Sequence, residues 1–328
     1  MALQSVRPED LPPLELRKLR DLDVRSGSDG EGRHIAAASG VVRRGDFTYV
    51  IGDDELDLGV FSNSSQEPGE LRKILAGELP EDPKERKRAK ADLEALTVLP
   101  PFEGASHGAL LGLGSGSLEG GTRDRGFFWA FGPDGSLVGE SRTLDVSPLY
   151  DMLRGRIERL NIEGASVLGD SLWLFHRANR GHSRNAVVEL DLGAVMRSLE
   201  TDWRIDVEEL REIREYDLGE LRGTRLSFSD ATPVADQLVV FTAAAEVDDG
   251  GDEDGQIRGS VVGTITAGGE VERLRAIDPA WKVEGVHAAV DTGVIDFVFV
   301  CDQDDPEVPS PLLSATMPID AAVEASPS

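Results

Sequence analysis

The sequence predicts an all-β protein folded as a five-bladed β-propeller, with a six-bladed ring as the alternative. First, a Glu or Ser followed by a small residue opens a short strand five times, at steps of 55 to 66 residues, at positions 39–40, 103–104, 163–164, 229–230 and 284–285. Second, an apolar strand that ends in polar residues follows each copy. Third, the last repeat lacks one strand, and the N-terminus has one to spare. Repeats of this length made of short strands are typical of propeller blades with long loops.

The five repeats expand into blades in chain order. Short apolar runs bounded by turn residues are read as strands. Four strands are expected in each of the first four blades and three in the fifth. The expected strands are 40–44, 46–52, 56–61 and 71–76 in blade one; 104–107, 109–114, 126–131 and 137–144 in blade two; 164–168, 171–176, 186–191 and about 212–217 in blade three; 230–234, 237–243, 259–266 and 271–276 in blade four; and 285–290, 295–301 and 311–317 in blade five.

The segment 14–20 is expected to supply the missing strand of blade five. It is similar to the segment 71–75, which is the predicted outer strand of blade one. Pairing it with blade five closes the ring and removes an exposed sheet edge. Residues 1–320 are therefore expected to form one propeller domain. The tail 321–328 has the composition of a disordered segment.

Two short helical insertions are expected between blades. Asp82 and Pro83 are an N-cap and a first helical residue, and strong helix formers follow them. Ser147 and Pro148 repeat this opening, and apolar residues at helical spacing follow at Leu149, Met152, Leu153 and Ile157. Each insertion precedes one of the five recurring motifs.

Composition excludes several classes of partner. The chain of 328 residues has 61 acidic and 34 basic residues, a net charge of −27. Nucleic acid and anionic membrane surfaces both require a cationic footprint, so neither is expected as a partner. The acidity is explained either by a solvated surface or by a cationic or metal ligand. The single cysteine, Cys301, excludes an intramolecular disulfide, and the absence of a signal peptide or long apolar run predicts a cytoplasmic protein. The oligomeric state stays open.

The candidate site lies at one mouth of the predicted ring. In a propeller, the first strand of each blade begins at the face where the second strand ends, so residues at these ends should converge. The first strands contribute Ser39, Glu103, Glu163, Ser229 and Glu284. The ends of the second strands contribute Asp53, Asp54, Ser115, His176, Asn179, Glu246, Asp302, Asp304 and Asp305. His107 and His287 are expected inside first strands, as histidines that line the hub.

These residues predict a divalent-metal site. Carboxylate oxygens are the ligands that calcium and magnesium prefer, and the expected ligands are Glu103, Glu163 and Glu284 with Asp53 or Asp302. His176 or Arg177 would orient an anionic group beside the ion. This predicts a metal-dependent hydrolase of a small anionic ester, lactone or phosphoester. The alternative is a non-catalytic scaffold that binds a small polar molecule or a protein, in which each Glu bonds backbone amides of the next blade. Whether the protein is an enzyme stays open.

The motif itself resembles those of known propellers. At 103–105, 163–165 and 284–286 the chain resembles the phytase-like and gluconolactonase-type propellers. In the latter, a Glu-Gly that opens a hub strand supplies a metal-ligand Glu, and the resemblance implies that role for Glu103, Glu163 or Glu284. The segments 38–55, 161–164 and 282–285 resemble an uncharacterised bacterial propeller family of this length. That family implies the fold and brings no known activity.

Overall fold

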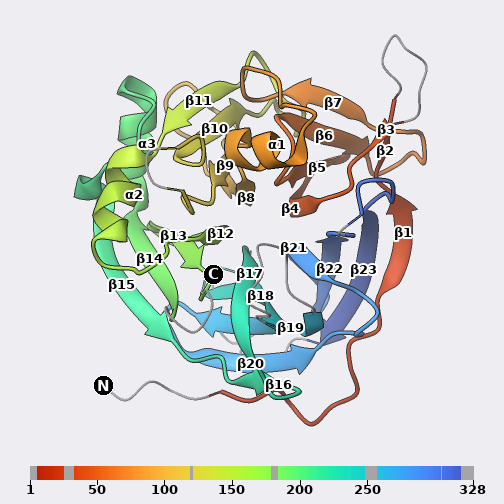
Figure 1. Ribbon diagram of the computed structural model, residues 1–328. Coiled ribbons are helices and arrows are strands. Elements are labelled where there is room, and N and C mark those ends of the chain that lie inside the picture. The colour runs from red at the N-terminus through yellow and green to blue at the C-terminus, as the bar shows by residue number, and fades with distance from the viewer. Residues whose placement is uncertain are drawn as a thin grey trace.

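Five antiparallel sheets stand around a central axis in the computed structural model, which describes residues 6–25, 33–118, 121–178, 184–235, 237–247, 257–303 and 305–318 (Figure 1). The fold is therefore the predicted five-bladed propeller, and the six-bladed alternative is wrong. The innermost strands of neighbouring blades pack side by side around the ring.

The blades follow one another in chain order. Blade one consists of β4 (Ala38–Arg44), β5 (Phe47–Gly52), β6 (Asp57–Ser62) and β7 (Glu70–Lys73). Blade two consists of β8 (Leu93–Leu99), β9 (Ala109–Gly114), β10 (Arg125–Ala130) and β11 (Arg142–Asp145). Blade three consists of β12 (Ile162–Leu168), β13 (Ser171–His176), β14 (Asn185–Asp191) and β15 (Leu210–Tyr216).

The last two blades differ from the first three at their edges. Blade four consists of β17 (Thr224–Ala235), β18 (Leu238–Glu246), β19 (Ile257–Thr266) and β20 (Val271–Ala276), with the short β16 (Glu220–Leu221) paired to β17. Blade five consists of β21 (Val283–Asp291), β22 (Val294–Cys301), β23 (Pro311–Pro318) and the N-terminal β1 (Arg17–Asp21). A separate two-stranded pair is formed by β2 (Asp23–Val24) and β3 (Arg33–His34).

The N-terminal strand forms the outer edge of the last blade. β1 runs antiparallel to β23, with Arg17 opposite Ser314 and Asp21 opposite Pro311. Leu22 directly after it is completely buried. One sheet thus contains both the first and the last described strand, which closes the ring.

One predicted strand is wrong. The first strand of blade two was expected at 104–107, but it is β8, which begins eleven residues earlier. Glu103 and Gly104 instead occupy a tight turn closed by a bridge between Phe102 and Ala105, and Gly104 has a φ of 86°. That left-handed backbone does not fit an extended strand.

The apolar core is divided among the five interfaces between blades. Each interface has its own cluster of buried side chains, and the cluster between blades two and three is extended by helices. Alternate residues of an innermost strand serve different interfaces: Val41 packs toward blade five and Val42 toward blade two. Side chains of a strand point alternately to its two faces, which explains this division.

Three α-helices interrupt the blades. α1 (Pro83–Ala89) begins at its predicted N-cap, since the Asp82 carboxylate accepts hydrogen bonds from Lys84 N and Glu85 N. α2 (Ser147–Arg154) buries Leu149, Tyr150 and Leu153, but its N-cap is Val146, so Ser147 is not the cap.

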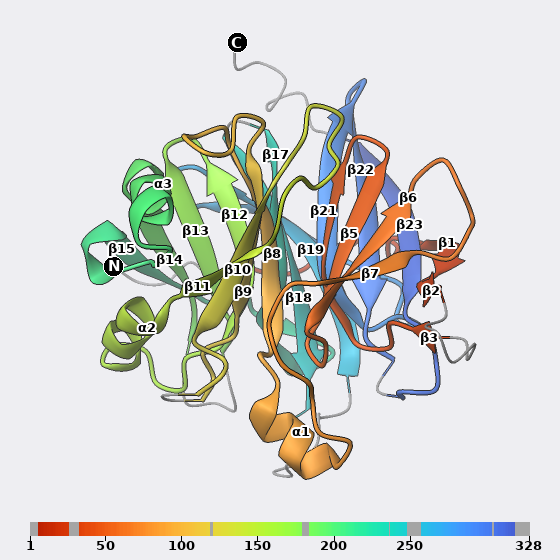
Figure 2. The same cartoon turned by 90° about the horizontal axis from the view of Figure 1, so that it is seen from above.

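The third helix, α3 (Leu192–Thr201), was not predicted, and a 3₁₀ turn, η1 (Val207–Glu209), follows it. α2 and α3 lie on the outer side of the ring, whereas α1 lies over one mouth (Figures 1 and 2). Among the described residues, no helix is long and apolar enough to span a membrane.

Candidate functional site

The innermost strand of every blade contains a β-bulge. The pairing between first and second strand shifts by one residue, at the second residue of the strand in four blades and in the middle of the longer β17 in blade four. The bulged residues are Ser39, Glu94, Glu163, Ser229 and Glu284. A bulge leaves one residue out of the ladder and redirects its side chain. The recurring motif in the sequence is therefore a bulge, and in blade two its polar residue is Glu94.

The small residue after the bulge allows neighbouring blades to approach closely. A Cβ added to Gly164 would lie 2.7 Å from Ala231 N in blade four. A Cβ added to Gly285 would lie 2.8 Å from Ser39 O in blade one. Both distances are shorter than any ordinary contact with a carbon atom. Glycine is required at these positions by the packing of innermost strands, not by an unusual backbone conformation.

Three polar groups of this ring bond neighbouring blades together. The Ser39 hydroxyl donates to Leu93 O at 2.6 Å. The Ser229 hydroxyl donates to Val283 O at 3.5 Å. Next to it, the buried Asp230 carboxylate accepts a hydrogen bond from Val286 N at 2.7 Å. These groups satisfy backbone atoms across two blade interfaces, which is a structural role.

The three bulged glutamates carry the acidic part of the site. With the residues that surround them they form the hub face, defined by the carboxylates of Asp53, Asp92, Glu94, Glu163, Glu246, Glu284 and Asp302 and by the cations Lys90, Arg123, Arg177 and Lys282. Among the described residues, seven carboxyl groups of the hub face thus lie near four cations.

The first cluster of the hub face lies between blades one and two. Carboxylate oxygens of Asp53, Asp92 and Glu94 lie within 4.8 Å of one another. Lys90, at the end of α1, pairs with Asp53 and lies 3.0 Å from Asp92 Oδ1. Arg123 lies 2.7 Å from Asp92 Oδ2. One oxygen of Asp53, Oδ1, is buried and has no hydrogen-bond partner in the described part of the chain.

Burial and neighbouring charges give the three carboxyls of this cluster, Asp53, Asp92 and Glu94, different pKa values. Burial raises the pKa of Asp53 to about 6, although Lys90 opposes the shift. Burial also raises the pKa of Asp92, but Lys90 and Arg123 outweigh it and hold that pKa below its usual value. Burial and the neighbouring Glu163 raise the pKa of Glu94 well above its usual value. Asp92 is therefore the permanent anion, and Glu94 is the carboxyl that holds a proton most readily.

The second cluster belongs to blade three. Arg177 lies 3.3 Å from Glu163 Oε2 and also pairs with Glu246 of blade four. The Asn161 amide donates to the other carboxylate oxygen of Glu163. Burial raises the pKa of Glu163 to about 7, with Arg177 acting against it. A carboxyl with this pKa exchanges its proton near neutral pH.

The third cluster belongs to blade five. Lys282 lies 2.9 Å from Asp302 Oδ2 and 3.7 Å from Glu284 Oε1. Burial raises the pKa of Glu284 to about 8, even though Lys282 and Arg177 lower it. Cys301, next to Asp302, is a buried free thiol whose pKa is raised by burial, as expected for an inert residue.

The structure brings most of the predicted acids together, but not all of them. Asp53, Glu163, Glu284 and Asp302 lie on the hub face. Glu103 does not, because its turn is exposed and its backbone amide bonds Glu200. The predicted metal role of Glu103 is therefore wrong.

The predicted histidines are placed differently from the acids. His107 lies in an exposed turn and not in a first strand, so its prediction is wrong. His176 has no exposed surface, and burial lowers its pKa to about 4. A neutral, enclosed imidazole cannot orient an anion. His287 does lie in β21, partly buried, with a pKa lowered to about 4 by burial. Asn179 and Asp304 lie outside the described residues.

The sequence does not predict five members of the hub face: Lys90, Asp92, Glu94, Arg123 and Lys282. In blade two, the signal is the pair Glu94-Ala95 at the start of an apolar run that follows the helical segment directly. Glu103-Gly104 matches the other motifs more closely, and it therefore hides this signal. The residue after the bulge is Ala95 in blade two, whereas it is glycine in blades one, three and five.

Comparison with known proteins identifies the family. Residues 34–317 match the model described as "Family of unknown function (DUF6929)". The chain belongs to this family. No curated protein matches the chain.

Two solved structures are similar to the chain over most of its length. Myxococcus xanthus glutaminyl cyclase is 13% identical over 94% of this chain and 100% of its own, with a TM-score of 0.47. The α-L-arabinofuranosidase PaAbf62A from Podospora anserina is 11% identical over 94% of this chain and 99% of its own, with a TM-score of 0.49. Because both TM-scores are below 0.5, neither likeness carries an argument about this chain.

Proposed function

We propose that the hub face binds a divalent cation, calcium or magnesium, at the carboxylates of Asp53, Asp92 and Glu94. The observation that carries the proposal is the approach of their oxygens to within 4.8 Å of one another. Three carboxylates at this spacing repel one another unless a cation compensates them. Hard oxygen ligands are those that both ions prefer. The unpartnered Oδ1 of Asp53 supplies a further ligand atom.

Lys90 already contacts two of the three proposed ligands, so its removal tests the proposal. Its ammonium group bonds both Asp53 and Asp92, and its pKa is raised by these carboxylates despite burial. It stays protonated, so it competes with a metal ion for the same oxygens and does not act as an amine nucleophile. Binding of a divalent ion requires the Lys90 side chain to turn away.

The activity that we propose for this site is hydrolysis of a small anionic ester, lactone or phosphoester. A bound ion would supply Lewis acidity and a bound water of lowered pKa. Glu163, whose pKa is about 7, is suited to hold or release a proton near neutral pH. Arg177 and Lys282 supply the positive charge that an anionic substrate group requires.

The decisive measurement is calorimetric titration of chelator-treated protein with calcium, magnesium and manganese. Glu94→Gln removes one ligand charge and should weaken binding at least tenfold. Lys90→Met removes the competing ammonium group and should strengthen it. Glu103→Gln, in the exposed turn, and Lys84→Met, on the exposed side of α1, change the same charges elsewhere and should leave the affinity unchanged.

Two outcomes of the titration would contradict the metal-binding proposal. Failure of both the wild-type protein and the Lys90→Met variant to bind any of the three ions would exclude a metal site here. Equal affinity in all variants would place the ion elsewhere. Hydrolysis itself is tested by screening carboxyl esters, lactones and phosphoesters, with Glu163→Gln expected to abolish activity and to spare ion binding.

A non-catalytic scaffold is the second candidate, and one observation favours it. Asp230, Ser39 and Ser229 bond backbone atoms of the next blade, as the scaffold alternative predicts for the whole ring. For the three bulged glutamates, that alternative predicts that substitution by glutamine lowers stability. The metal proposal predicts the opposite for the ion-free protein, since fewer like charges are then crowded together.

A further inference from the structure

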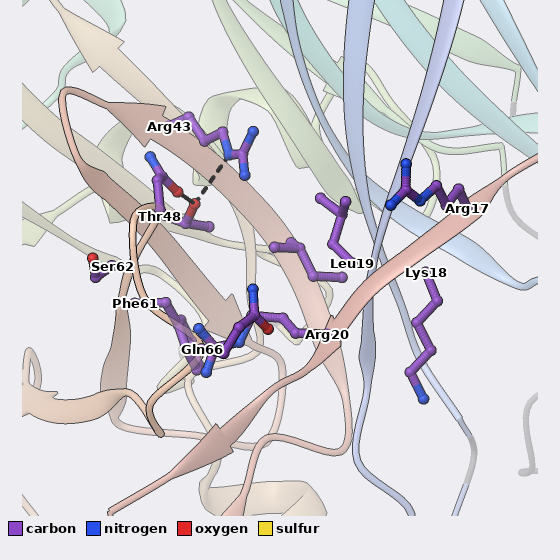
Figure 3. A pocket seen from close by; sticks show the side chains of 11 residues that line it. Arg17, Lys18, Leu19, Arg20, Arg43, Thr48, Phe61, Ser62 and Gln66 are labelled. Atoms are coloured by element: carbon purple, nitrogen blue, oxygen red, sulfur yellow. Dashed lines mark hydrogen bonds between the residues drawn. The ribbon is translucent and has the colours of Figure 1, made fainter.

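A polar cavity, separate from the hub face, lies at the seam where the ring closes. We call it the seam pocket: about 210 Å³, between β1 and β23 of blade five and β4, β5 and β6 of blade one, with a lining of Arg17, Lys18, Leu19, Arg20, Arg43, Thr48, Phe61, Ser62, Asn63, Gln66 and Leu312 (Figure 3). Four of these residues are cationic and none is acidic. In a chain with a net charge of −27, such a lining is the reverse of the average surface.

Arg43 is held in the seam pocket without a counter-ion. Its Nε donates to Thr48 Oγ1 at 3.2 Å, and Thr48 Oγ1 donates in turn to Asn63 Oδ1 at 2.5 Å. No carboxylate among the described residues bonds it. The Arg43 side chain is partly buried, and this burial lowers its pKa. Its two terminal nitrogens stay available for a planar, two-pronged contact with an oxyanion.

Two further arginines come from the N-terminal strand. Arg17 bonds no carboxylate of the described chain, and Figure 3 shows it and Arg43 reaching from β1 and from blade one, with Leu19 between them in this view. Arg20 lies over the Phe61 ring, 5.1 Å from its centroid, and donates to the carbonyls of Ser65 and Glu67. Its positive charge is thus fixed by backbone oxygens and not cancelled by a hydrogen-bonded carboxylate.

Acidic groups lie near part of the lining. Lys18 pairs with Asp21 at 2.6 Å and points away from Arg43 in Figure 3. Ser62 donates to Asp46 at 2.8 Å, and the charge of Asp23 acts on Arg20. Arg17 and Arg43, which bond no carboxylate of the described residues, therefore line the pocket together with the apolar side chains of Phe61, Leu19 and Leu312.

We propose that the seam pocket binds a small organic oxyanion, a phosphate or carboxylate that carries a short apolar or aromatic group. The anion would contact Arg43 and Arg17, and the apolar group would lie against Leu19 and Phe61. Drug-sized ligands need about 300 Å³ or more, so a smaller molecule is implied. Uncompensated, partly buried arginine is unfavourable, and an anion relieves this cost. Because β1 and blade one would both hold the ligand, binding would also stabilise ring closure.

The test uses the full-length protein and phenyl phosphate as the probe, with inorganic phosphate, phenylacetate and phenol as comparisons. Calorimetry should show binding of phenyl phosphate and phenylacetate, weaker binding of inorganic phosphate and none of phenol. Arg43→Met keeps the aliphatic stem and should weaken phenyl phosphate binding at least tenfold. Arg156→Met, an exposed residue after α2, changes the net charge equally and should leave the affinity unchanged.

Thermal melting separates loss of binding from loss of folding. Without ligand, Arg43→Met should melt as cooperatively as the wild type and at the same or a higher temperature, because an unpaired cation has been removed. Phenyl phosphate should raise the melting temperature of the wild type only. Binding of phenol as tight as that of phenyl phosphate, equal affinity in Arg43→Met, or no binding by the wild type would each overturn the proposal. Arg17→Met provides an independent second variant with the same expected loss.

Discussion

At the residue scale, the bulged residue of the innermost strand has a different role when it is serine than when it is glutamate. Serine there bonds the next blade, as Ser39 does. Glutamate there remains on the hub face with a raised pKa, as Glu163 and Glu284 do. A raised pKa of a buried carboxyl means that ionisation costs folding free energy. Ionisation of these hub-face carboxyls therefore lowers the stability of the folded protein.

Stability should fall as the pH rises above about 6.5. Burial raises the pKa of Glu163 to about 7 and of Glu284 to about 8, from the ordinary value of 4.5, so the native state holds protons that the unfolded state has lost. Their contribution is complete below about pH 4.5 and is lost as the pH rises through 7 and 8. The pKa values of His176 and His287 are lowered by burial to about 4, and their opposite effect is confined to lower pH.

Denaturant unfolding at pH 6.5, 7.5 and 8.5 measures this effect. Each proton corresponds to a slope of up to about 1.4 kcal/mol per pH unit. Glu284→Gln should flatten the slope, and Glu103→Gln should not. A free energy of unfolding that stays constant or increases over this range would contradict the raised pKa values.

Gly164→Ala should destabilise the protein without affecting any charged group. The new Cβ would lie 2.7 Å from Ala231 N and would force two innermost strands apart. Overpacking of this kind costs about 1–3 kcal/mol. Gly193→Ala is the control, because its Cβ would meet only the ends of flexible side chains, at 3.3 Å or more, at the start of α3. Equal melting temperatures for the two variants would show that the close approach of the blades is not required.

At the element scale, the short terminal elements connect distant parts of the chain. β1 pairs with β23, so residues nearly three hundred positions apart share one sheet. α1 places Lys90 against Asp53 and Arg86 against Asp54, 2.5 Å away, and so covers the mouth at blade one. Two cations at this helix thus neutralise acidic residues at the end of a neighbouring strand.

Deletion of residues 1–22 should open the ring. It removes β1 and the buried Leu14 and Leu22, and it exposes the edge of β23. An unpaired edge strand promotes aggregation, and the loss of a closing strand lowers cooperativity. Light scattering and melting curves should show both effects, and a synthetic peptide of residues 6–25 should reverse them. A truncated protein with the melting curve of the full-length chain would refute this role of β1.

At the scale of the whole molecule, the excess of acid is not distributed evenly. The hub face gathers seven carboxylates against four cations, whereas the seam pocket is lined by basic residues alone among its charged groups. The acidic hub face favours a cationic ligand, and the basic seam pocket favours an anionic one. The two proposals are therefore independent, and neither experiment depends on the other.

The sequence alone determined the propeller class, the strands of blades one, three, four and five, and two of the helices, whereas the choice of five blades over six came from the structure. Local patterns specify these features: apolar runs of strand length, turn residues between them and a capped helix start. The same reasoning placed Asp53, Glu163, Glu284 and Asp302 at one face, because equivalent positions in a repeat meet there. Whether they form a metal site stays a prediction.

Tertiary structure alone decided which of two similar motifs in blade two opens the strand. Glu94-Ala95 and Glu103-Gly104 differ little as local patterns, and only packing against blades one and three selects Glu94. It also decided which acids are paired, since Lys90, Arg123 and Lys282 reach their partners through contacts that no spacing encodes. The seam pocket likewise exists only because the first strand returns to the last blade. Titratable groups on separate segments acquire their shifted pKa values and their ion-pair partners only when folding brings those segments together.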